Sequence, residues 1–172
     1  MHELHLLRHA KSSQDDGVDD RERPLSRRGR DDARAIARHL PEAVGRVDLV
    51  LCSSALRTRE TLELVMVGFS PRPSVLTEDA LYLASPATLL RRLRRIKEAC
   101  GTVMVIGHNP GLHELASLLC APDSPDGDEL LGGKFPTLAR ASFRVETRWA
   151  ALDAGRNPLI GYVTPKLLGA ED

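Results

Sequence analysis

Leu4-His5-Leu6-Leu7-Arg8-His9-Ala10 combines a strand with the two polar side chains that end it. Its apolar residues predict a buried strand over Glu3 to Leu7, close to the start of the chain. The strand ends on Arg8 and His9, after which residues 11–24 form a charged segment rich in Asp, Ser and Gly. A guanidinium beside an imidazole is poorly suited to a core, but it can hold an anion next to a nucleophile.

Further strands are predicted where short apolar runs lie between turn-forming residues. Two of them read as buried strands, a third is shorter, and the last alternates apolar and polar residues as a half-exposed antiparallel strand does. In chain order, the buried strands cover residues 47–52 and 102–106, the short one 74–76, and the alternating one 141–145.

Helices are predicted between these strands, because capping residues precede helical patterns of apolar residues. The predicted starts are Ser26, Ser53 or Ser54, Ser85-Pro86 and Asn109-Pro110, and the first helix ends at Pro41. Repeated β-α units predict a three-layer α/β/α fold whose central sheet is mainly parallel with at least one antiparallel strand. We expect residues 1–172 to form a single domain.

Composition argues against several classes of protein. The 24 Lys and Arg residues balance the 24 Asp and Glu residues, whereas nucleic-acid binders usually carry a basic excess. Aromatic residues make up only 3% of the chain, too few for base-stacking platforms. No apolar stretch approaches the length of a membrane span, no secretory signal is visible, and three widely spaced cysteines suit a reducing compartment. We therefore expect a cytoplasmic protein that binds neither nucleic acid nor membrane.

Polar residues follow three of the predicted strands, at the edge of an open α/β sheet where ligands bind. Arg8 and His9 follow the first strand, Arg57 lies shortly after the second, and His108 follows the strand over 102–106. If these strands are parallel and adjacent, two arginines and two histidines converge on one anion pocket. Helices that start nearby would add backbone N–H groups and positive dipole ends.

Phosphoryl transfer is the chemistry that fits such a pocket. The planar fork of arginine matches two phosphate oxygens at once, and a neutral histidine can attack phosphorus to form a phosphohistidine. We expect His9 to be the nucleophile, with its other ring N–H donated to a backbone carbonyl. Arg8, Arg57 and His108 would hold the phosphoryl oxygens, His108 as a cation. No metal and no organic cofactor is expected.

These residues belong to a longer series of motifs that covers nearly the whole chain. The motifs are Leu7-Arg8-His9-Ala10, Arg23-Pro24-Leu25-Ser26 with Gly29, Ser53-Ser54-Ala55-Leu56-Arg57-Thr58 with Thr61, Val105-Ile106-Gly107-His108-Asn109, Phe135-Pro136-Thr137 and Thr164-Pro165-Lys166. In this order they resemble the histidine phosphatase superfamily, and within it the short SixA-type phosphohistidine phosphatases. The resemblance implies a phosphoglycerate mutase-like fold, a nucleophile at His9 and a phosphate clamp at Arg8, Arg57 and His108.

The sequence departs from the family pattern at two points. The third motif position is usually glycine and is Ala10 here, which is tolerable if residue 10 does not need a positive φ. Larger members also place a carboxylic acid near the leaving group, for which Glu78 and Asp79 are the candidates. The short branch commonly lacks this acid, and the imidazole of a phosphohistidine leaves more readily than an alkoxide. The favoured substrate is therefore a phosphohistidine-bearing protein.

Other interpretations stay open beside this one. The substrate could be a small phosphorylated metabolite, or the chain could be a catalytically silent module that binds a phosphorylated ligand. The 121–137 segment could be a lid or disordered, and the acidic cluster over 15–20 reads as solvated rather than metal-binding. A basic run could be a solvated face or a docking patch for an acidic partner; it comprises Arg91, Arg92, Arg94, Arg95 and Lys97.

Overall fold

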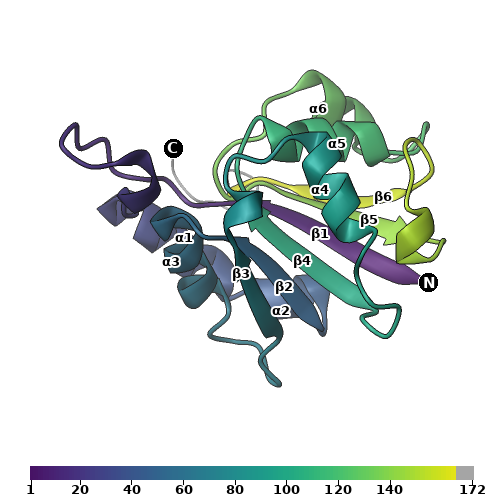
Figure 1. Cartoon of the computed structure of the whole chain (residues 1–172), viewed down its shortest axis with the longest axis horizontal. Coiled ribbons are helices and arrows are strands. Elements are labelled where there is room, and N and C mark those ends of the chain that lie inside the picture. The colour runs from purple at the N-terminus through teal and green to yellow at the C-terminus, as the bar shows by residue number, and fades with distance from the viewer. Residues whose placement is uncertain (166–172) are drawn as a thin grey trace.

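The computed structural model describes residues 1–165, and within them a single mixed sheet forms the centre of the molecule (Figure 1). Its strands are β1 (His2–Arg8), β2 (Leu49–Ser53), β3 (Ser74–Glu78), β4 (Thr102–Gly107), β5 (Arg140–Val145) and β6 (Leu159–Val163). Their order across the sheet is β3-β2-β4-β1-β5-β6. The pairs β1–β4, β2–β4 and β2–β3 are parallel, whereas β5 pairs antiparallel with both β1 and β6. The predicted mainly parallel sheet with an antiparallel strand is confirmed.

Two layers of helices cover the two faces of this sheet (Figure 1). Successive residues of β1 point to opposite faces, so that Leu4 and Leu6 join one core and Leu7 joins the other. The first core is completed by α4 (Pro86–Leu93), α5 (Gly111–Leu119) and α6 (Gly127–Gly132). The second core is completed by α1 (Arg27–Ala37), α2 (Leu40–Val44) and α3 (Leu56–Val65). The three-layer α/β/α prediction is therefore confirmed.

Two of the predicted helix caps are present as hydrogen bonds. The Ser26 hydroxyl accepts from the backbone N–H of Gly29 at 3.0 Å, and the Ser85 hydroxyl accepts from that of Thr88 at 3.1 Å. The other two predicted caps are wrong. The N-cap of α3 is Ala55, and that of α5 is Pro110. The side chains of Ser53 and Asn109 hydrogen-bond to His108 and to the Phe135 carbonyl instead.

Some elements differ from the sequence-based expectation. The first helix ends at Ala37, and Pro41 lies in the first turn of the separate helix α2. Strand β6 was not predicted, and α6 lies inside the 121–137 segment that was expected to be a loop. Three short 3-10 helices complete the description: η1 (Asp20–Glu22), η2 (Asp79–Leu81) and η3 (Trp149–Ala151).

No helix within residues 1–165 combines the length and the apolar character needed to cross a bilayer. Thr164 and Pro165, from the last sequence motif, lie just after β6, whereas Lys166 lies outside the described residues.

Candidate active site

His9 leaves the carboxyl end of β1 and is held there by the neighbouring strand. Its backbone N–H donates to the carbonyl of Gly107 at the end of β4, at 3.2 Å. His9 is 6% exposed, and its Nδ1 lies 2.6 Å from the carbonyl oxygen of Ala10. Because a carbonyl can only accept, Nδ1 carries the hydrogen and Nε2 carries the free lone pair. The predicted N–H to a backbone carbonyl is therefore present.

Ala10 occupies the position that is usually glycine, and its backbone needs no special conformation. The residues with positive φ other than glycine in the described part of the chain are Leu83, Asp123, Asp126 and Leu138, so Ala10 is not among them. Its backbone N–H donates to the Thr61 hydroxyl at 3.0 Å, and that hydroxyl donates to the carbonyl of Arg57 at 2.7 Å. This chain of hydrogen bonds ties the His9 loop directly to α3.

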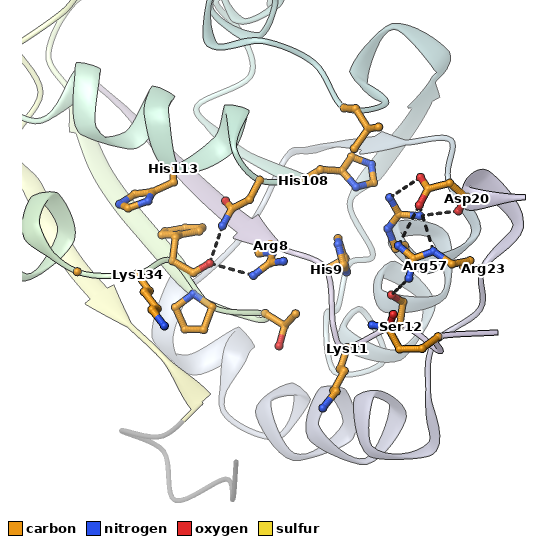
Figure 2. A pocket seen from close by; sticks show the side chains of 17 residues that line it. Arg8, His9, Lys11, Ser12, Asp20, Arg23, Arg57, His108, His113 and Lys134 are labelled. Carbon is orange, nitrogen blue, oxygen red and sulfur yellow. Dashed lines mark hydrogen bonds and ion pairs between the residues drawn. The ribbon is translucent and has the colours of Figure 1, made fainter. Parts of the chain in front are cut away.

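Arg8 and Arg57 lie on opposite sides of His9 (Figure 2). Arg8 is the last residue of β1 and donates through Nη1 to the carbonyl of Phe135 at 3.1 Å. Arg57 is in the first turn of α3, only 3% exposed, and donates through Nη1 to the carbonyl of Asp20 at 2.7 Å. Each guanidinium keeps a buried Nε without a hydrogen-bond partner among the described residues. Unpaired buried donors are costly, so this pair favours an anionic acceptor.

His108 follows β4 and lies above His9 in Figure 2, with 5.4 Å between the two ring centroids. Its Nε2 lies 2.7 Å from the hydroxyl of Ser53, the last residue of β2. Its Nδ1 is buried without a partner in the described part of the chain. Asn109, the next residue, donates to the same Phe135 carbonyl that Arg8 uses, at 2.7 Å. The three strand ends therefore meet at one place, as predicted.

Burial and the arginines keep both histidines neutral. Burial, opposed in part by the Ala10 hydrogen bond and reinforced by the charges of His108, Arg8 and Arg57, lowers the pKa of His9 from 6.5 to about 3. Burial and the charge of Arg57 lower the pKa of His108 from 6.5 to about 4. Burial beside two guanidiniums thus favours the neutral form of His108, and the cationic form expected when it clamps a phosphoryl oxygen stays a prediction.

Asp20 is a site residue that sequence reasoning missed. The sequence predicts a solvated acidic cluster over 15–20, but the Asp20 carboxylate lies 3.0 Å from Arg57 Nη2 and 2.9 Å from Arg23 Nη2, and it accepts from the Tyr82 hydroxyl. The Tyr82 hydrogen bond, with those from Arg57 and Arg23, holds the pKa of Asp20 well below its usual range. Asp20 is thus an ionised carboxylate beside the two arginines, and the Asp-rich segment itself offered no periodic signal for it.

The two carboxylates considered as acids lie elsewhere. Glu78 forms a two-pronged ion pair with Arg92, at 2.7 and 3.0 Å, and Asp79 lies 3.5 Å from Arg21. Neither residue lines the pocket, and Asp20 is the one carboxylate among the described residues that does. The predicted basic face is also partly neutralised, because Arg92 pairs with Glu78 and Arg94 lies 3.6 Å from Asp153.

The pocket around His9 has a volume of about 900 Å³ and extends well beyond the four predicted residues. Residues 133–137, at the end of the 121–137 segment, build one wall, and Leu130 of α6 in the same segment is fully buried in the core. Among residues 1–165, no three His, Cys, Asp or Glu side chains are grouped so that they could hold a metal ion. Further lining residues are Lys11, Ser12, Gln14, Arg23, Leu83, Asn109, His113, Gly133, Lys134, Phe135, Pro136 and Thr137.

The chain is similar in sequence to a known family. Residues 4–81 match the model of the histidine phosphatase superfamily (branch 1). An uncharacterised protein of Mycobacterium tuberculosis is 35% identical over 162 residues, which cover 93% of this chain and 100% of the relative.

Among solved structures, the chain is similar to SixA proteins. SixA from Nakamurella multipartita is similar with a TM-score of 0.82 and 30% identity, covering 95% of this chain and 96% of that one. The protein histidine phosphatase SixA in complex with tungstate has a TM-score of 0.78 and 25% identity, covering 96% and 99% of the two chains. The fold is phosphoglycerate mutase-like. The chain belongs to the histidine phosphatase superfamily, within it to the SixA type, and it is a phosphatase.

Proposed function

We propose that this phosphatase works through a phosphohistidine on His9, and that its substrate is a phosphohistidine-bearing protein. The phosphohistidine mechanism is supported by one hydrogen bond of the His9 ring, in which Nδ1–H donates to the Ala10 carbonyl at 2.6 Å. That bond leaves the Nε2 lone pair free in a ring kept neutral by burial. A neutral nucleophile between two guanidiniums needs no further base to act on phosphorus.

The reaction has two steps. In the first, His9 Nε2 attacks phosphorus, the new P–N bond forms, and the bond to the leaving group breaks with its electron pair on the leaving group. In the second, water attacks phosphorus and gives up a proton to the solvent, the P–N bond breaks, and its electron pair returns to Nε2, which leaves inorganic phosphate and a neutral His9. Arg8, Arg57 and His108 hold the equatorial oxygens, whose charge grows in both transition states. A bound dianion raises the affinity of His108 for a proton, so that it can become the expected cation there.

The choice of a phosphohistidine substrate rests on the leaving group. The only carboxylate at the pocket is Asp20, among the described residues, and it is held ionised by Tyr82, Arg57 and Arg23. A resident carboxylate that stays ionised is a poor proton donor for an alkoxide. An imidazole leaving group depends less on such a donor, which favours a phosphoramidate over a sugar phosphate. The SixA relatives, one of which is described as a protein histidine phosphatase, point the same way.

The test is to trap the intermediate and compare substrates. After mixing with a phosphohistidine protein or with 4-nitrophenyl phosphate and quenching in alkali, the parent should carry acid-labile, alkali-stable phosphate. His9→Ala should carry none and lose turnover while keeping its circular dichroism spectrum, and the exposed His39→Ala should behave as the parent. Turnover retained in His9→Ala would refute the mechanism. Faster turnover of phosphate esters than of phosphohistidine proteins would refute the substrate, and phosphate binding without turnover would indicate a silent binding module.

A further inference from the structure

Two lysines in the pocket are not used by the phosphoryl cluster. The sequence has four lysines, and Lys11 and Lys134 both line this pocket. Both side chains are exposed, and neither ammonium has an ion pair or hydrogen bond with any residue in the range 1–165. The other long cations of the pocket, by contrast, all donate to carbonyl or carboxylate oxygens, as shown for Arg8, Arg23 and Arg57.

The backbone of Lys11 is fixed although its ammonium is free. Its carbonyl accepts from both the backbone N–H and the hydroxyl of Ser26, at 2.9 and 3.1 Å. The first turn of α1 packs so closely that a Cβ on Gly29 would lie 2.0 Å from the Lys11 oxygen. Lys11 is therefore held two residues from His9, with only its flexible stem able to move.

The backbone of Lys134 is fixed in the same way. Its carbonyl accepts from the hydroxyl of Tyr162 on β6 at 2.7 Å. The next residue, Phe135, is buried, and its own carbonyl receives Arg8 and Asn109. Two lysines whose carbonyls are hydrogen-bonded and whose ammonium groups have no partner among residues 1–165 suit a bound anion rather than an internal ion pair.

In Figure 2, Lys11 lies below His9 and Lys134 lies beyond Arg8, so both line the pocket outside the group of side chains that would hold the phosphoryl group. In-line displacement directs the leaving group away from the nucleophile, into the part of the pocket that the phosphoryl group does not fill. That part is rich in positive charge, because Asp20, the only carboxylate of the lining among the described residues, is already bound to Arg57 and Arg23. The charge there matches a negative group carried by the leaving group.

From this arrangement, we infer that Lys11 and Lys134 form a subsite for a carboxylate or phosphate on the leaving-group side, so that the enzyme prefers substrates with a second anionic group. The inference rests on the proposed function, since it concerns the leaving group of the same reaction. Acidic side chains next to a phosphohistidine and the second anionic group of a small metabolite share this chemistry.

The first test uses two substrates that differ only in charge. These are 3-carboxy-4-nitrophenyl phosphate and its 3-carbamoyl analogue, which have similar shape and leaving groups. Exposed ion pairs are weak, so we expect the parent to prefer the carboxylate by about fivefold to tenfold in kcat/KM at low salt. The preference should fall as salt is raised, because the groups are solvent-exposed.

Variants assign the preference to the two lysines. Lys11→Gln and Lys134→Gln together should reduce the ratio of the two kcat/KM values to about twofold or less, and Lys11→Glu should reverse the preference; the ratio is the readout because a loss common to both substrates cancels in it. Lys97→Gln is the matched control, because Lys97 is exposed and lies outside the pocket. Equal turnover of the two substrates by the parent would overturn the subsite while leaving the phosphatase mechanism intact. Failure to hydrolyse either substrate would instead count against the proposed function.

Two phosphohistidine peptides distinguish the sources of the anion. One carries aspartates and the other asparagines on both sides of the phosphohistidine. A preference for the aspartate peptide that disappears in the double Lys→Gln variant assigns the subsite to protein substrates. A preference confined to the aryl carboxylate assigns the subsite to small molecules. If neither the aryl substrates nor the peptides show a preference for negative charge, the subsite proposal is overturned.

Discussion

The carboxylate of Asp20 lies 3.0 Å from Nη2 of Arg57, although the two residues are 37 positions apart in the chain. Arg57 is one of the two guanidiniums that we propose to hold the phosphoryl group. A fixed negative charge therefore lies beside the place where a dianion would bind. Phosphoryl oxygens and Asp20 must share the same cation, and they repel each other across it.

This competition predicts that Asp20→Asn binds phosphate more tightly. Asparagine can still accept a hydrogen bond from Arg57, so that the substitution removes charge more than position. We expect the inhibition constant of inorganic phosphate in the aryl phosphate assay to fall by about threefold to tenfold, since one like charge is removed near the surface. Asp79→Asn, at an exposed carboxylate outside the pocket, should leave it unchanged. A weaker inhibition in Asp20→Asn would mean that Asp20 acts mainly by orienting Arg57.

Ser53→Ala should impair His108 without removing it. The Ser53 hydroxyl lies 2.7 Å from Nε2 of His108 and accepts from the backbone N–H of Ala55 at 3.3 Å, so it orients the ring. Loss of one buried hydrogen bond should lower kcat/KM for an aryl phosphate by about tenfold. Ser54→Ala is the matched control, because the hydroxyl of Ser54 is buried without a partner among the described residues. If both variants lose activity equally, the hydrogen bond to His108 does not explain the effect.

The low pKa of His9 predicts a specific loss of stability in acid. The unfolded chain protonates this ring below 6.5, whereas the folded protein resists protonation down to about 3. Between these values the unfolded state binds more protons, so folding becomes less favourable as pH falls. The slope is about 1.4 kcal/mol per pH unit for one such group, or about 2 kcal/mol between pH 6.5 and pH 5.

Urea unfolding of the parent and of His9→Gln at pH 6.5 and pH 5 measures the contribution of His9 to the pH dependence of the free energy of unfolding. The variant should lose about 2 kcal/mol less than the parent, because it no longer carries the buried ring. His39→Gln, at an exposed position, should follow the parent. Parallel losses in parent and His9→Gln would show that the His9 pKa is not depressed in the folded protein.

The parts of the fold and of the site that depend on residues adjacent in the sequence could be predicted from the sequence, whereas the parts that depend on distant residues could not. Strands β2 and β4 are apolar runs and β1 is largely apolar from Leu4 to Leu7, and each ends abruptly on polar residues, so that both the strands and their functional ends could be predicted. That these strands are neighbours, with β4 between β1 and β2, is set by packing of both sheet faces and could only be assumed. The roles expected for Arg8, His9, Arg57 and His108 follow from the chemistry of side chains at strand ends, and the resemblance to a known family implies the same roles.

The features that escaped prediction depend on distant partners. Helix α6 contains two glycines and is stabilised by burial of Leu130 rather than by helix propensity. Asp20 lies in a segment without periodicity, and only the fold brings it to Arg57 and Tyr82. Ser53 and Asn109 resembled helix caps because their side chains suit that role, but the site uses both for His108 and Phe135.

Gly29 offers a test of how the fold positions the nucleophile. It lies in the first turn of α1, where alanine would ordinarily stabilise a helix by up to about 1 kcal/mol. Here a Cβ would lie 2.0 Å from the carbonyl oxygen of Lys11, so Gly29→Ala must move the helix or the loop that carries His9. We expect a net loss of about 1–3 kcal/mol in urea unfolding, together with a fall in kcat. Gly132→Ala is the control, because its Cβ would meet no atom within 4 Å, and it should unfold at the same or slightly higher urea concentration. A Gly29→Ala protein as stable and active as the parent would show that the α1–Lys11 contact does not set the position of His9.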